Sequence, residues 1–255
     1  MVIANVGYSE DLAYIHNEGF IDMARSAAAT VLHLLHKQKV QNGLVVDLGC
    51  GGGVLAEILT QAGYHVLGIE ISENMLKLAR QRAPKTQFIR GSLFQAKLPE
   101  CVAVTAIGQC VNYQFDRRSK SGLAGLFRRI YCALSPGGVF LFDVVEPGRV
   151  SKPPSLHFEG KDWAILVDKE EDIRRHVLTR RMTMFRKSGR LFRRSEEVHR
   201  QRLYPLTEIR GELISAGFRV RRLPGYGNEH FPSGRAAFAA RKPCFMPVDY
   251  PHLEG

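Results

Sequence analysis

Glycines at positions 49, 51 and 53 dominate the segment Val45-Val46-Asp47-Leu48-Gly49-Cys50-Gly51-Gly52-Gly53. Glycine adopts positive φ without strain and lets the backbone come close to a ligand. A helix that starts directly after such a loop points its first N–H groups into the same space. The segment is therefore predicted to bind a small molecule.

Two acidic residues narrow the identity of that molecule. Asp47 stands two residues before the first glycine, where a carboxylate can attract an ammonium group. Glu70 ends the next predicted strand and can accept hydrogen bonds from both hydroxyls of a ribose. The glycine spacing differs from the G-x-G-x-x-G dinucleotide fingerprint, which disfavours a dehydrogenase. The segment also lacks the Gly-Lys-Ser/Thr ending of a phosphate-binding loop. The combination favours S-adenosylmethionine (SAM).

The elements that must position these residues alternate along the first part of the chain. An amphipathic helix is predicted over 19–36. Strands are predicted at 44–48, 65–71, 87–90, 102–107 and 139–144, with helices over 54–61, 72–83 and 123–134, and a turn at 135–138. Alternating strands and helices require right-handed crossovers and a parallel sheet covered on both faces. Ligands of such sheets lie at the carboxyl ends of the strands.

The pattern changes after Pro147-Gly148. Strands are predicted at 163–167, 177–185 and 191–204, with a hairpin turn at 187–189. A helix at 207–216 and strands at 218–220 and 236–240 follow. We therefore predict one domain formed by residues 1–150 and 206–243, with an antiparallel β insertion at 151–205.

On these residues the chain resembles the class I SAM-dependent methyltransferases, over about 8–146 and more loosely over 206–243. The resemblance rests on residues 46–53, on the acid within Gly68-Ile69-Glu70-Ile71-Ser72, and on Leu134-Ser135-Pro136-Gly137-Gly138. It implies an α/β fold with a Rossmann-like, doubly wound sheet of seven strands. These strands are mostly parallel and the last one is antiparallel.

The resemblance also implies roles for single residues around SAM. Gly49, Cys50 and Gly51 would line the methionine part, Glu70 would hold the ribose, and Ile71 would pack on adenine. Ser92 and Leu93 would lie at the adenine edge, although many members have Asp where this chain has Ser92, and a hydroxyl binds the adenine amino group more weakly. Gln109 would face the methionine or the sulfonium. The segment 13–17 would fold over the cofactor as a lid through Tyr14 or His16.

Methyl transfer from a sulfonium is an in-line displacement, so the enzyme mainly needs alignment and exclusion of water. A general base is needed only when the acceptor must lose a proton. His16 and His199 are the candidates for that role. The sequence indicates no metal site, because the five cysteines are scattered and form no C-x-x-C pair.

The acceptor is expected to lie under the insertion, which in small-molecule members of the family covers the substrate crevice. Strand alternation places Glu197, His199, Gln201 and Leu203 on one face of 197–204, and Arg200, Arg202 and Tyr204 on the other. Candidate acceptor contacts are Tyr113, Trp163, His199, Arg200 and Tyr204. Because arginine suits a carboxylate or phosphate, an anionic acceptor stays open.

Composition leaves three functions open. The net charge is +11, of which residues 151–255 carry +8, so an RNA or protein methyltransferase competes with a small-molecule O- or N-methyltransferase. A non-catalytic SAM-binding module is the third alternative. The absence of an Asn/Asp-Pro-Pro-aromatic motif and of an RNA-binding module favours a small acceptor, so nucleic acid is not expected.

No membrane span or secretory signal is evident, which predicts a cytoplasmic protein. The oligomeric state is not indicated.

Overall fold

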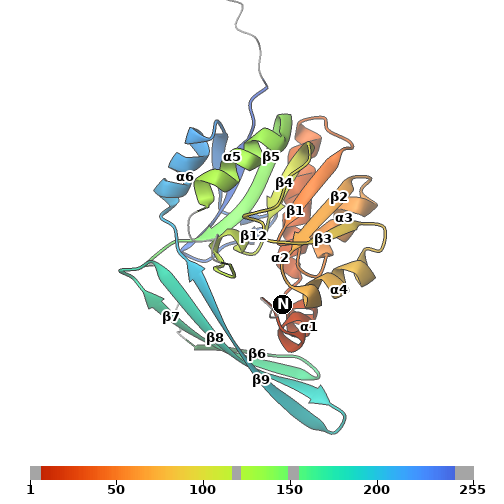
Figure 1. Ribbon diagram of the computed structural model, residues 1–255, viewed down its shortest axis with the longest axis vertical. Helices are drawn as coiled ribbons and strands as arrows, with labels where there is room; N and C mark the ends of the chain where they lie inside the picture. The colour runs from red at the N-terminus through yellow and green to blue at the C-terminus, as the bar shows by residue number, and fades with distance from the viewer. Residues whose placement is uncertain (1–6, 117–121, 149–154, 245–255) are drawn as a thin grey trace, which may run out of the picture.

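The computed structural model describes residues 7–116, 122–148 and 155–244. Its centre is a seven-stranded sheet with the order β3-β2-β1-β4-β5-β13-β10 (Figure 1). The strands are β1 (Leu44–Leu48), β2 (His65–Glu70), β3 (Gln87–Arg90), β4 (Cys101–Ala106), β5 (Leu134–Val145), β10 (Arg219–Leu223) and β13 (Arg235–Arg241). Strands β1 to β5 pair in parallel, whereas β13 runs antiparallel to both β5 and β10. The predicted fold class is confirmed.

Two layers of helices cover the sheet because its strands are apolar on both faces. Val45 of β1 points to the side of α2 (Asp22–Lys37) and α3 (Val54–Gln61). Its neighbour Val46 points to the side of α5 (Leu123–Ala133) and α6 (Leu206–Ser215). Helix α4 (Glu73–Arg82) follows β2 and is capped by Ser72, whose hydroxyl accepts from Met75 N. No helix in these described ranges is long and apolar enough to cross a membrane.

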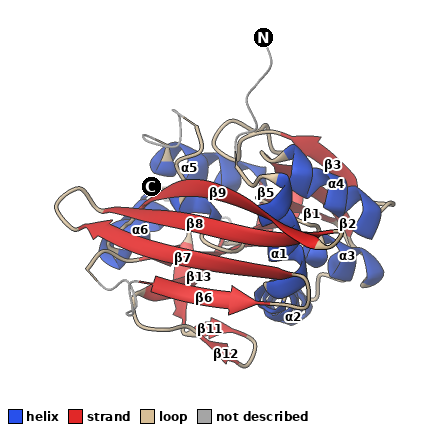
Figure 2. Cartoon of the chain, turned by 90° about the horizontal axis from the view of Figure 1, so that it is seen from below, coloured by secondary structure: helices blue, strands red, loops and turns tan. Residues whose placement is uncertain are grey.

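A second, antiparallel sheet lies across the end of the central sheet where β5 finishes (Figures 1 and 2). Its strands follow chain order: β6 (Ser155–Glu159), β7 (Trp163–Asp172), β8 (Val177–Ser188) and β9 (Leu191–Arg202). The sequence analysis did not predict β6, nor the short pair β11 (Gly225–Tyr226) and β12 (Glu229–His230). The first residues of the predicted insertion, 151–154, lie outside the described residues.

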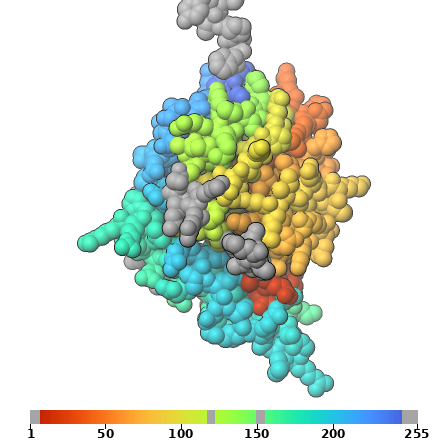
Figure 3. All heavy atoms as spheres, in the orientation of Figure 1, coloured from red at the N-terminus to blue at the C-terminus, as the bar shows by residue number. Residues whose placement is uncertain are grey.

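The start of the chain differs from the prediction. A separate helix, α1 (Glu10–Gly19), precedes α2, and the hydroxyl of Ser9 caps it by accepting from Leu12 N. Figure 3 shows α1 (red) between the body of the molecule and the projecting second sheet. The packing explains its position, because Leu12 and Ile15 of α1 form an apolar cluster with residues of β7 and β8.

Residues 135–138 also differ, since they are part of β5 instead of a turn before it. The β4–β5 register shifts between Cys101 and Ala103, so these residues form an irregular first part of the strand. Gly137 has φ +81° and donates its N–H to the Lys242 carbonyl. The glycine-containing turn signal therefore marks a bulge in a strand.

Candidate active site

The glycine loop is a tight connection between β1 and α3. Gly49, Gly51 and Gly53 have φ of +70°, +53° and +77°, a region that favours glycine. A Cβ atom on Gly49 would lie 2.6 Å from Cys110 Sγ, and one on Gly53 would lie 3.0 Å from the backbone of Ala79. Close approach to two neighbouring elements therefore adds to the backbone requirement for glycine.

Two buried carboxylates lie beside the loop at the ends of adjacent strands. Glu70 accepts from Gly51 N at 3.1 Å and from Ser72 N at 2.8 Å, and burial raises its pKa in spite of these hydrogen bonds. Asp47 accepts from the Thr105 hydroxyl at 2.7 Å. Burial raises the pKa of Asp47 to about 7, with a smaller contribution from the charge of Glu70. Neither carboxylate forms an ion pair with a described residue, so a bound cation would stabilise both.

A cavity opens in front of the loop and the two carboxylates. The structure brings to this cavity most of the residues predicted to bind SAM: His16, Asp47, Gly49, Cys50, Gly51, Glu70, Ile71, Ser92 and Leu93. The hydroxyl oxygen of Ser92 accepts from Phe94 N at 3.1 Å, which leaves its own hydrogen available to a ligand. Among the described residues, no group of three or more His, Cys, Asp or Glu side chains could hold a metal ion.

A second cavity lies between the central sheet and the inner face of β7, β8 and β9. Six residues line both cavities: Tyr8, His16, Phe20, Met23, Gly108 and Tyr113. The two spaces therefore meet at a boundary formed by the segment around α1 and by the loop after β4.

His199 lines the second cavity and is held by a carboxylate. Its Nε2 lies 2.8 Å from Glu197 Oε2, and Glu197 Oε1 accepts from Ser9 N at 2.7 Å. The rings of Tyr8 and Tyr113 contact the imidazole edge-on. The imidazole of His16 makes no hydrogen bond to a described residue, and burial, aided by the charge of Arg180, lowers its pKa to about 4. His16 is therefore neutral near pH 7.

Four predicted positions are corrected by the structure. Tyr14 lines neither cavity, because its hydroxyl donates to Asp162 at 2.8 Å. Arg200 is exposed in a groove on the outer face of the second sheet. Trp163 packs against Gly19 and the apolar face of α1, and Tyr204 belongs to the core beside α6.

Gln109 does not face the first cavity, where it was expected to contact the methionine part or the sulfonium of SAM. It lines the second cavity and not the first, and its backbone is left-handed with φ +62°. Its N–H and that of Gly108 donate to the buried carboxylate of Asp143, at 3.1 and 2.8 Å. Asp143 also accepts from Tyr226 and from Arg235, whose Nη2 lies 2.7 Å away. The sequence analysis missed Asp143, although a carboxylate at the end of an apolar strand was a possible signal.

Comparison with known proteins bears on the region that builds the first cavity. Residues 45–138 match the family model of the methyltransferase domain. Residues 45–138 therefore form a methyltransferase domain. The match runs from β1 through the glycine loop to the glycines of β5, so it covers the residues on which the sequence resemblance rested.

Relatives and solved structures extend the similarity of this methyltransferase beyond that region. It is 27% identical over 219 residues to the putative methyltransferase YqeM of Bacillus subtilis, covering 79% of this chain and 85% of that protein. It is 25% identical over 245 residues to a dTDP-3-amino-3,4,6-trideoxy-alpha-D-glucopyranose N,N-dimethyltransferase of Streptomyces venezuelae, covering 91% and 98%. The structure of SAM-bound CalS10, an amino pentose methyltransferase from Micromonospora echinaspora, superposes with a TM-score of 0.71 at 20% identity, covering 93% and 98%.

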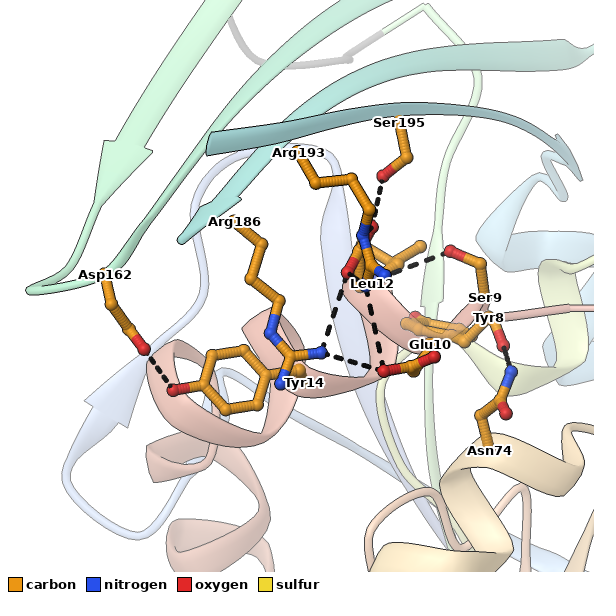
Figure 4. Close-up of polar contacts among 11 residues, drawn as sticks. Tyr8, Ser9, Glu10, Leu12, Tyr14, Asn74, Asp162, Arg186, Arg193 and Ser195 are labelled. Atoms are coloured by element: carbon orange, nitrogen blue, oxygen red, sulfur yellow. Dashed lines mark hydrogen bonds and ion pairs between the residues drawn. The ribbon is translucent and has the colours of Figure 1, made fainter. Parts of the chain in front are cut away.

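Helix α1 is held against the second sheet by two acidic residues, Glu10 and Asp11, and Figure 4 shows Glu10 beside Arg186 and Arg193. Asp11 is buried and accepts from Arg193, with Nε at 3.1 Å, and from the Ser195 hydroxyl at 2.8 Å. Arg186 adds a contact at 3.6 Å. Burial acts to raise the pKa of Asp11, but these partners outweigh it and hold the pKa below its ordinary value. A lowered pKa means that the contact is complete above about pH 4 and is lost as the pH falls through the lowered value.

We expect Asp11→Asn to loosen α1 at pH 7, because it removes the buried one of the two carboxylates that hold Arg186 and Arg193 and leaves only the exposed Glu10. The chain has one tryptophan, Trp163, which packs against Gly19 at the end of α1. Its fluorescence should therefore shift to the red, and protease cleavage within α1 should become faster. The loss should be about 1.5–3 kcal/mol of local stability, as for hydrogen bonds to charged groups.

Glu18→Gln is the matched control, since it removes one negative charge from the same helix. Glu18 is exposed, and its carboxylate accepts a hydrogen bond from Asn17. Its emission spectrum should equal that of the wild type. If Asp11→Asn also leaves the emission and the cleavage rate unchanged, Asp11 does not hold the helix.

Proposed function

We propose that this methyltransferase moves the methyl group of SAM to an oxygen or nitrogen nucleophile of a small molecule. The observation that carries the proposal is the meeting of two cavities at a shared boundary. The first would hold the donor and the second the acceptor. Transfer by in-line displacement needs the two reacting atoms to face each other across such a boundary.

The residues of the first cavity fit SAM. Glu70 and Asp47 are buried carboxylates without a cation, and SAM carries an ammonium group and a positive sulfonium. The remaining lone pairs of Glu70 suit ribose hydroxyls, while Ile71 and Leu93 offer apolar contacts for a base. When bound, SAM supplies an electrophilic methyl group.

The residues at the boundary would orient the acceptor and exclude water. His199 is the better of the two candidate bases, because Glu197 fixes its Nε2 and leaves Nδ1 as an acceptor for a proton. His16, with its pKa near 4, is better suited to accept a hydrogen bond than to take up a proton. A nitrogen acceptor is supported by the similarity to an amino-sugar N,N-dimethyltransferase, which extends over 91% of the chain and so includes the second sheet.

Calorimetry with SAM and with S-adenosylhomocysteine tests the first half of the proposal. Micromolar binding of both is expected, and absence of binding at millimolar concentration by folded protein would refute it. The second half is tested by incubating the enzyme with methyl-labelled SAM and a cell extract separated into small molecules, RNA and protein. Label is expected in the small-molecule fraction. Label only in RNA or protein would refute a small-molecule acceptor and would identify RNA or protein as the acceptor instead.

A further inference from the structure

The inner wall of the second cavity carries two cations side by side. In the antiparallel registers of the second sheet, Lys169 of β7 stands opposite Arg180 of β8, and Arg180 stands opposite His199 of β9. Directly opposed residues have their Cβ atoms about 4.5–5.5 Å apart, and like charges in this arrangement are destabilising. All three side chains line the cavity.

The charge of Arg180 is little compensated, although Asp22 and Glu229 also line the cavity. The guanidinium of Arg180 forms no ion pair with any described residue, and its one side-chain hydrogen bond among them goes to the Tyr113 hydroxyl at 3.2 Å. Two carboxylates on neighbouring positions of the same face have other partners. Glu197 binds His199 and Ser9 N, and Glu171 accepts from Gly148 N. Burial and the charge of Arg180 lower the pKa of Lys169, as expected when two cations share a wall.

An unsatisfied amide lies on the same wall. Gln201 of β9 is fully buried, and neither its Nε2 nor its Oε1 has a hydrogen-bond partner. Gln201 lines the cavity, stands opposite Leu178, and is bridged on its other side by Tyr113. A buried amide without hydrogen-bond partners is destabilising, so its position favours a ligand that supplies a hydrogen-bonding group.

We propose that this wall, formed by Lys169, Arg180 and Gln201, binds an oxyanion of the acceptor. The substrate would then be a small molecule that carries a carboxylate or phosphate group as well as its nucleophile. The inference rests on the proposed function and adds the substrate class. Arg180 provides a directed, charge-assisted contact, Lys169 adds charge, and Gln201 donates through Nε2. The Arg180–Tyr113 contact links this subsite to the boundary with the first cavity.

The test measures inorganic phosphate binding by ³¹P titration at constant ionic strength in chloride. The protein is saturated with S-adenosylhomocysteine, so that phosphate does not enter the first cavity. Saturable binding is expected for the wild type, and Arg180→Met should weaken it about tenfold or more. Gln201→Leu and Lys169→Met should also weaken it. Acetate as a competitor distinguishes the two anions: displacement at a similar concentration indicates a carboxylate site, and weak displacement indicates a phosphate site.

Arg181→Met is the matched control, because Arg181 is the next residue on β8 and points to the outer face, where it pairs with Glu170. Its phosphate affinity should stay within about twofold of the wild type. The proposal is overturned if the wild type binds no phosphate saturably, if Arg180→Met binds it as the wild type does, or if Arg181→Met loses as much affinity.

Failure of the subsite can be told apart from failure of the proposed function. Binding of S-adenosylhomocysteine is measured on the same samples, and the phosphate titration is repeated without it. Loss of phosphate binding with retained S-adenosylhomocysteine binding in Arg180→Met supports the subsite. If the wild type binds S-adenosylhomocysteine but no phosphate, the subsite alone is refuted. If the wild type binds phosphate but not S-adenosylhomocysteine, the donor site is refuted.

Discussion

Asp143→Ala is expected to lower the free energy of unfolding by about 3–5 kcal/mol, the range for removing one partner of a buried ion pair. Asp143 is fully buried at the end of β5 and is the acceptor for Gly108 N, Gln109 N, the Tyr226 hydroxyl and the Arg235 guanidinium. Alanine would leave a largely buried guanidinium and three other donors without this acceptor. Denaturant unfolding followed by circular dichroism measures the change.

Asp168→Ala is the control for Asp143, since Asp168 is an exposed carboxylate that accepts from the Ser155 hydroxyl. Its cost should be within about 0.5 kcal/mol, as for surface substitutions. Should Asp143→Ala fail to fold, Asp143→Asn keeps the shape and still removes the charge. A loss from Asp143→Asn no greater than that of the control would show that the carboxylate does not hold the loop after β4.

The second large effect is expected for the donor site. Glu70→Ala should weaken binding of S-adenosylhomocysteine about a hundredfold and Glu70→Gln about tenfold, because charge-assisted hydrogen bonds contribute about 1.5–3 kcal/mol each. Glu70 would bind the ribose and also holds Gly51 and Ser72 through their N–H groups. Calorimetry well below the unfolding temperature measures the affinity.

The control for Glu70 is Glu73→Gln, three residues further on. Glu73 begins α4 and pairs with Arg80 at 2.8 Å, outside the first cavity. Its affinity should change less than about twofold. An unchanged affinity in well-folded Glu70→Gln would contradict the ribose role, and a fall in stability without a fall in affinity would leave Glu70 a structural residue.

Local rules were sufficient to predict from the sequence that the glycine loop, Asp47 and Glu70 meet at one cavity. The glycine loop, Asp47 and Glu70 each lie at the end of a short apolar strand, and parallel strands bring their carboxyl ends to one edge. The order of the elements therefore fixes which residues meet there. The position of α1 was harder to predict, because it depends on apolar packing against β7 and β8 and on ion pairs of Glu10 and Asp11 with arginines 176 and 182 residues away in the chain.

The acceptor side shows where sequence reasoning stops. Alternation along β9 correctly placed His199 and Gln201 on one face and Arg200 on the other. Which face meets the cavity depends on how the second sheet packs, and periodicity does not encode that. Arg180 was missed for the same reason: in a strand with several arginines, only tertiary packing separates the one that faces inward from Arg181, which faces outward.

The place of β13 has a consequence for synthesis of the chain. Residues 235–241 fill the slot between β5 and β10, although both neighbours are translated earlier. Until these residues leave the ribosome, β5 and β10 each lack the partner strand that lies between them, and exposed strand edges are sites of aggregation. Arg235, the partner of Asp143, is delivered with the same strand. A polypeptide that ended before residue 235 would therefore lack both the closing strand and the cation that completes the loop after β4.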